Sequence, residues 1–216
     1  MKRSINTFGL LCLGLMFVLS DAGAQMRSGK LGVGLSGIMG NISGDQASTS
    51  FGLGGGLSVA YSMTEYVSLR ASAQLEQMGF KDAAGVSGKT SMFSGNGYLA
   101  LDVSPNSTFN PYILAGGGYA LFYPKLTGQN SSLGVSTPLD FHIAFGGGAD
   151  IFFNEFWSVS AQGEYVLTGS KKYDGFEGSG KDKILRFSLQ IRYYFFDQDF
   201  IAKLLDAQAE RYEKKK

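Results

Sequence analysis

Hydrophobic and polar residues alternate along most of the chain with a repeat of two positions. The segment 67–75, VSLRASAQL, shows the pattern clearly, because apolar side chains take its odd positions and polar side chains its even positions. A period of two is typical of a β-strand whose two faces meet different surroundings. The same pattern predicts eight strands, at about 30–40, 51–63, 66–77, 91–104, 111–123, 140–153, 157–168 and 183–196.

The connections between these strands alternate in length. Three of them are short, SMTE, PNSTFN and NEF, whereas the intervening ones are long and rich in Gly, Ser, Asn, Lys and Asp. Short turns at one end and long loops at the other are typical of an up-and-down barrel that crosses an outer membrane. The sequence therefore predicts an all-β, eight-stranded antiparallel transmembrane β-barrel over residues 25–196, with periplasmic turns and extracellular loops.

Composition and strand length agree with a membrane location. Each predicted strand has about 10 to 14 residues, and a strand tilted by about 45° needs roughly 9 to 11 to cross a bilayer. Only 17% of the residues are charged, against about 25% in an average soluble domain. A soluble eight-stranded ligand carrier of the lipocalin type is the alternative, but its outer face needs more charge than these strands offer.

Aromatic residues gather at the ends of the predicted strands. Two aromatic bands around aliphatic middles are typical of the two membrane interfaces, although aromatic residues also favour strands in general. Beside the short turns we expect a girdle of Tyr61, Tyr66, Tyr112, Phe153, Trp157, Tyr193 and Phe195, together with Phe109, Phe156, Tyr194 and Phe196. Beside the long loops lie Phe51, Phe80, Phe93, Phe122, Tyr123 and Phe141.

Charged residues within the strands share the face opposite to the apolar one. An Arg or Lys that faces lipid at mid-depth costs about 2–4 kcal/mol, so we expect these residues to point into the barrel. Counting from the short turns predicts a lower layer of Arg70, Asp102, Asp150 and Arg192, and an upper layer of Glu76, Glu164 and Arg186. Glu164 and Arg186 come at nearly equal height on neighbouring strands and are predicted to pair. We expect side chains to fill the lumen.

Glycine triplets occur within three of the strands, at 54–56, 116–118 and 146–148. No helix follows any of them, which disfavours a phosphate-binding loop. Glycine inside a strand more often marks a bend or a close backbone approach, as a narrow barrel requires.

Both ends of the chain differ from the middle. Lys2 and Arg3 precede an apolar core of about a dozen residues, and small residues follow it at 22–24. This order predicts a signal peptide over 1–24. An uncleaved membrane anchor is the alternative, but an anchor needs roughly 20 apolar residues. The only cysteine, Cys12, lies within this segment, so no disulfide is expected in the exported chain. The charged segment 197–216 follows the last strand and predicts a short amphipathic helix in the periplasm. Three placements are compatible with this segment: a solvated end, a helix that lies on the inner leaflet, or the contact for a periplasmic partner.

The residues resemble the bacterial outer-membrane β-barrel domain family, the group related to the transmembrane parts of outer membrane proteins A, X and W. The resemblance covers about 28–196 and rests on PYILAGGGYALF (111–122), FGGGADIFFNEFWSVSAQGEY (145–165) and LRFSLQIRYYF (185–195). It implies an outer-membrane location, and Leu189, Ile191, Tyr193 and Phe195 resemble the signal read by the barrel-assembly machinery. It does not decide among structural, surface-contact and narrow-pore roles.

Catalysis is the weaker hypothesis. His142 is the only histidine and is placed near the outer end of the inward face, but its neighbours, FHIAF, include no serine. A small barrel enzyme acting on lipid therefore remains an alternative, and no cofactor or metal is expected. Lys125, Lys171, Lys172 and Lys181 in the long loops are candidates for lipopolysaccharide phosphates or simply for loop solubility. The near-neutral charge gives no indication of a nucleic-acid partner.

Overall fold

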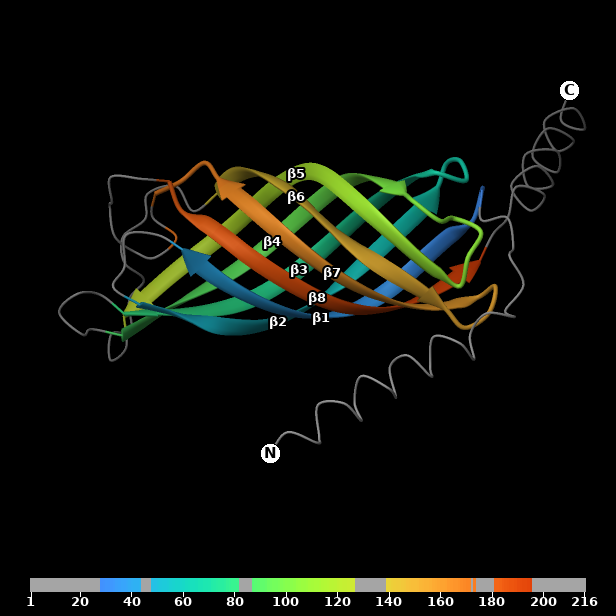
Figure 1. Cartoon of the computed structure of the whole chain (residues 1–216). Coiled ribbons are helices and arrows are strands. Elements are labelled where there is room, and N and C mark those ends of the chain that lie inside the picture. The colour runs from blue at the N-terminus through green and yellow to red at the C-terminus, as the bar shows by residue number, and fades with distance from the viewer. Residues whose placement is uncertain are drawn as a thin grey trace, which may run out of the picture.

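The computed structural model describes residues 28–43, 48–81, 87–126, 139–171, 173 and 181–195, and these form eight antiparallel strands (Figure 1). The odd-numbered strands run towards the long loops and the even-numbered strands run back. Their bounds are β1 Leu31–Ser43, β2 Ser48–Ser62, β3 Val67–Lys81, β4 Ser87–Asp102, β5 Phe109–Leu126, β6 Leu139–Phe152, β7 Trp157–Thr168 and β8 Lys183–Phe195.

Each strand pairs with its neighbours in the sequence, and β1 pairs with β8, so the sheet closes into a barrel. The closing seam is continuous and runs from Leu31 opposite Phe195 to Ser43 opposite Lys183. Closure leaves no unpaired strand edge, which a sheet inside a membrane requires. The predicted strand number, order and direction are confirmed.

Several strands extend further towards the long loops than the sequence predicted. β3 and β4 pair up to Lys81 opposite Ser87, whereas the predicted bounds stopped at 77 and began again at 91. The predicted bounds followed the end of the apolar alternation, but backbone pairing continues as a hairpin after the side chains have become polar. The barrel wall therefore rises above its apolar band at this end.

The two faces of the wall have opposite polarity. Arg186 and Arg192 are each 1% exposed and point into the barrel, whereas Leu189 and Ile191 on the same strand are 61% and 55% exposed. Apolar side chains outside and polar side chains inside invert the usual order of a soluble protein and match a barrel surrounded by lipid. This arrangement excludes the lipocalin-type alternative.

Inward-facing glycines allow the wall to curve tightly. A Cβ on Gly116 would meet the backbone oxygen of Gly97, and one on Gly118 would meet that of Gly95. On β1, a Cβ on Gly34 would meet Ser58 Oγ, and one on Gly40 would meet Glu76 Oε2, so these glycines leave room for inward polar side chains. The glycines serve close approach, as predicted.

The predicted signal peptide at 1–24 and the predicted helix at 197–216 lie outside the described residues. Among the residues described, no helix is long and apolar enough to cross a membrane.

Candidate functional site: the filled lumen and its rims

The lower charged layer lies near the short turns. Arg70 Nη2 contacts Asp102 Oδ1 at 3.3 Å and Asp150 Oδ2 at 3.0 Å, and Arg192 Nη1 lies 3.5 Å from Asp150 Oδ1. Asp150 therefore joins two arginines from β3 and β8. The Arg70 guanidinium also lies 3.7 Å from the centre of the Tyr112 ring, a favourable cation–π geometry.

The upper charged layer is centred on Arg186. Its Nη1 donates to Glu164 Oε2 at 3.1 Å, which confirms the predicted pair, and its Nε lies 2.8 Å from Glu76 Oε1. Tyr98 donates its hydroxyl to the same Glu164 oxygen at 3.0 Å. The seven predicted charges thus form two layers, and each layer contains both signs.

Neutral polar groups fill the space between the charges. Ser58 donates to Gln190 Oε1 at 3.1 Å, and the Arg192 Nη2 donates to the same oxygen at 3.1 Å. Tyr112 donates its hydroxyl to Gln162 Oε1 at 2.9 Å. Hydrogen bonds of this kind satisfy polar side chains that the lumen removes from water.

An apolar layer closes the lumen towards the long loops. Tyr173, from the connection between β7 and β8, is fully buried there and stacks on Phe122, with ring centres 4.1 Å apart. Thr90 donates its hydroxyl to the Tyr173 carbonyl, and the Tyr173 amide donates to Asp182 Oδ2 at 2.8 Å. Burial raises the pKa of the Tyr173 hydroxyl, so it remains neutral. The remaining apolar members of the layer include Ile42, Met78, Met92, Val166 and Ile184.

Burial of the inward side chains shows that the lumen is filled. Arg186, Arg192, Phe122 and Met78 are each no more than 1% exposed, although they lie at different depths. A water-filled pore would leave the side chains that line it accessible. At the short-turn end, Arg70, Asp102 and Asp150 border only a small hollow of about 10 Å³.

His142 lies within this filled lumen. Its side chain is on the inward face with 2% of the residue exposed, and its Nε2 lies 2.6 Å from Asn96 Oδ1. Asn96 in turn donates to Gln74 Oε1 at 3.3 Å and to Ser94 Oγ at 3.3 Å. The histidine is therefore one member of a buried hydrogen-bonded cluster rather than a group at an open rim.

The aromatic residues divide between the two faces. Tyr66 and Phe153 are 57% and 55% exposed, and Trp157 packs against the opposite Tyr193 with ring centres 4.9 Å apart. Tyr61 and Phe195 are partly exposed. The same outward position holds for Phe51, Phe93, Phe109, Tyr123, Phe141 and Phe156.

Four aromatic predictions are wrong. Tyr112, Tyr194, Phe80 and Phe122 are at most 5% exposed and point into the lumen. Both faces of β5 carry apolar or aromatic residues and no charge within its membrane-spanning part, so alternation alone did not identify the inward face. The pairing of Tyr112 with Ser160 and Gln162 supplies what a buried tyrosine hydroxyl requires. The sequence did not indicate that Tyr173 is buried, because apolar and polar residues do not alternate regularly in its loop.

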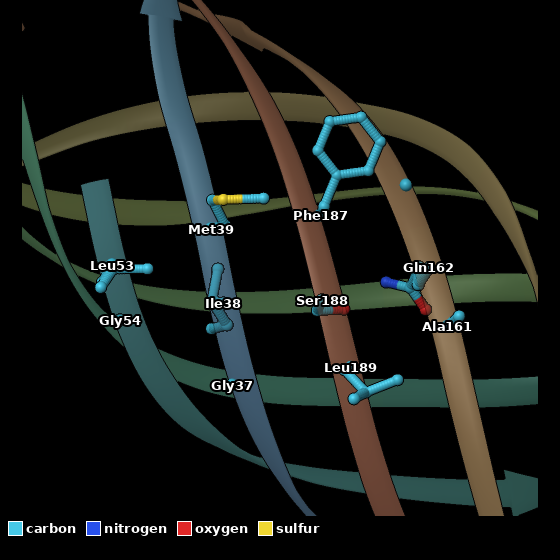
Figure 2. A pocket seen from close by; sticks show the side chains of 11 residues that line it. Gly37, Ile38, Met39, Leu53, Gly54, Ala161, Gln162, Phe187, Ser188 and Leu189 are labelled. Atoms are coloured by element: carbon cyan, nitrogen blue, oxygen red, sulfur yellow. The ribbon is translucent and has the colours of Figure 1, made fainter. Parts of the chain in front are cut away.

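The outer wall carries an apolar groove of about 670 Å³ across β2, β1, β8 and β7. Figure 2 shows the large side chains of Met39, Leu53, Phe187 and Leu189 together with the small residues Gly37 and Ala161. The groove exists because small residues interrupt rows of large outward side chains. In a bilayer this apolar hollow is a place for lipid hydrocarbon.

A closed antiparallel barrel with an apolar exterior and a filled polar lumen defines an integral β-barrel membrane protein. The family model of the outer membrane protein beta-barrel domain matches residues 8–201. The chain belongs to that family, and it is an outer-membrane protein. None of the curated proteins matches the chain significantly.

Solved outer-membrane barrels share this fold. The attachment invasion locus protein Ail of Yersinia pestis is 17% identical with a TM-score of 0.53, and the match covers 78% of this chain and 99% of Ail. Neisserial surface protein A is 15% identical with a TM-score of 0.57 over 78% of this chain and 100% of its own. OprG from Pseudomonas aeruginosa is 16% identical with a TM-score of 0.53 over 81% of this chain and 99% of its own. At these identities the likeness establishes the fold alone.

Proposed function

We propose that the protein is a closed, non-conducting barrel that acts through its outer wall and its loop-bearing end. The observation that carries this proposal is the near-complete burial of the large inward side chains in the two charged layers and in the apolar layer. Two layers of paired charge and the Tyr173 layer lie in series, so the opening of any one of them leaves the others in place. This supports a structural or surface-contact role over a permanently open pore.

Solute flux through liposomes tests the proposal. Vesicles that contain the purified protein should swell in isotonic small sugars no faster than protein-free vesicles, while a general porin serves as the positive control. Tyr173→Ala should behave in the same way, because the layer around Arg186 lies beneath it. Sugar entry through the unmodified protein would overturn the closed-barrel proposal.

We also propose that the barrel is not an enzyme. Most of the solved barrels that resemble it are not described as enzymes. The one histidine, His142, is buried, and its Nε2 lies beside Asn96 and not beside a nucleophile. A general base must reach the proton it removes, which His142 does not do from its buried position. The assignment would be reversed if the unmodified protein turned over lipid and the His142→Ala variant did not.

The export route is part of the proposal. We expect cleavage after Ala24, a barrel inserted by the assembly machinery, and a tail from residue 197 that extends into the periplasm, where it is available to a partner. Amino-terminal sequencing of the membrane-extracted protein should begin at Gln25. A chain that retains Met1 would contradict the predicted signal peptide.

A further inference from the structure

Three lysines lie together on the outward face of the wall at its long-loop end. Lys89 of β4 and Lys125 of β5 are directly opposite each other in the strand register, and Lys81 of β3 is diagonal to Lys89. All three side chains are exposed. Opposite residues in an antiparallel pair have Cβ atoms about 5 Å apart, so one anionic group can contact both Lys89 and Lys125.

This arrangement opposes the stability of the isolated barrel. Like charges directly across a strand pair repel each other. The outward faces of β3, β4 and β5 are described along their whole length, and they carry no Asp or Glu that could neutralise the cluster. A bound anion would remove the repulsion. Solubility alone does not explain the cluster, because lysines that lie far apart would provide it equally well.

A groove lies directly below the lysines. The next row towards the membrane centre consists of Leu53, Gln77, Ser91 and Tyr123, and the row below it contains Leu75 and Phe93. These side chains border a hollow of about 370 Å³ on the outer wall. The strand register shifts between Ser50 and Leu53, and such an irregularity bends the strand beside the hollow.

The chemistry of this region changes with depth in a defined order. Ammonium groups come first, then an amide and two hydroxyls, where Gln77 Nε2 donates to Ser91 Oγ at 3.4 Å, and finally aliphatic and aromatic carbon. A phosphorylated lipid has the same order, from phosphate through polar linkage to acyl chain. Lysine binds phosphate as a point charge, and each lysine close to an anionic surface contributes about 1 kcal/mol.

We propose that Lys81, Lys89 and Lys125, with the groove below them, form a binding site for a phosphorylated lipid of the leaflet that surrounds the long-loop end. The phosphate contacts the facing lysines and one acyl chain occupies the groove. The site rests on the membrane placement of the barrel but not on its closed lumen, so sugar entry in the swelling assay would leave this proposal standing.

Binding of purified lipid A to the full chain in detergent tests the site. Lys89→Gln with Lys125→Gln should weaken binding about thirty-fold, which corresponds to about 1 kcal/mol for each lysine. Lys183→Gln is the matched control, because Lys183 is also outward at the long-loop end but faces Ser43 and Leu167. It should leave the affinity within about twofold.

Two further measurements separate the parts of the site. Ser91→Phe, which fills the groove and keeps the lysines, should also weaken lipid A binding, and dephosphorylated lipid A should bind as weakly as the double lysine variant does. Inorganic phosphate at the same concentration should not displace lipid A. Heat-dependent gel mobility verifies that each variant forms the barrel.

The proposal is overturned if the double lysine variant binds lipid A as the unmodified protein does, or if Lys183→Gln weakens binding equally. Equal binding of dephosphorylated lipid A also overturns it. Displacement of lipid A by inorganic phosphate alone would identify a free-phosphate site and remove the lipid from the proposal.

Discussion

Arg186 Nε lies 2.8 Å from Glu76 Oε1 across the lumen, although β8 and β3 are not neighbours in the barrel. The same arginine contacts Glu164 on the adjacent β7. A single buried cation therefore connects distant parts of the wall through the interior. The side chains of all three residues are 1% exposed, so each charge depends on its partners rather than on water.

Replacing Arg186 should strongly destabilise the barrel. Arg186→Met leaves Glu76 and Glu164 buried together without a cation, and removal of one member of a buried charge set costs about 3–5 kcal/mol. Urea unfolding in detergent, followed by Trp157 fluorescence, measures the loss. Adding Glu76→Gln and Glu164→Gln to Arg186→Met should recover a large part of it, because the set is then neutral. A single variant as stable as the unmodified protein would contradict the role of this layer.

The lower layer should depend more on Asp150 than on Asp102. Asp150 contacts two arginines, Arg70 and Arg192, and its side chain is 2% exposed. Asp102 contacts one arginine, Arg70, is 9% exposed, and also accepts hydrogen bonds from the neutral side chains of Ser68 and Asn110. We expect Asp150→Asn to lower the free energy of unfolding by about 3 kcal/mol and Asp102→Asn by about 1 kcal/mol. The two urea midpoints give the comparison, and equal losses would contradict the greater contribution assigned to Asp150.

Glycine substitutions should separate close approach from simple chain flexibility. A Cβ on Gly116 would meet backbone atoms of β4, which cannot move aside as a side chain can, whereas a Cβ on Gly37 has no atom within 4 Å. We therefore expect Gly116→Ala to destabilise the barrel by about 1–3 kcal/mol and Gly37→Ala to have little effect. The fraction of folded barrel after refolding provides the measurement. Similar behaviour of both variants would refute the packing argument.

Trp157 reports the depth of the girdle, because it is the only tryptophan. It is 45% exposed on the outer wall next to the short turns. Its fluorescence in bilayers should be quenched more by lipids labelled near the headgroup than by lipids labelled at the chain end, since aromatic belts lie at the interface. Trp157→Phe supplies the background. Stronger quenching by the deep label would place this end of the wall near the membrane centre.

The sequence predicted the strands and the charged layers because lipid requires apolar side chains on the outer face, so that charged side chains are found on the inner face. Arg186 and Glu164 were placed at the same height by counting alone, and the structure pairs them. Tyr112 was misplaced because the inward face of β5 is nearly as apolar as the outward one, so its alternation carried little information. The contact between Arg186 and Glu76 depends on barrel closure and on the space left by Gly40, which local patterns do not contain.

Residues from the loops were the hardest to predict. Tyr173 is buried against Phe122 although it belongs to a polar connection. Tyr173 is buried because apolar residues from several strands surround it. No residue near Tyr173 in the sequence indicates these contacts. The lysine pair was also missed, because Lys89 was assigned to a loop rather than to a strand paired with Lys125.

Single-channel recording in a planar bilayer tests the closed lumen most directly. After insertion of the protein, the bilayer should show no stable conductance steps above those of the detergent control, since buried side chains fill the lumen at the two charged layers and at the apolar layer. Tryptophan quenching on the same preparation verifies insertion. A reproducible ohmic conductance from correctly inserted protein would contradict the closed barrel.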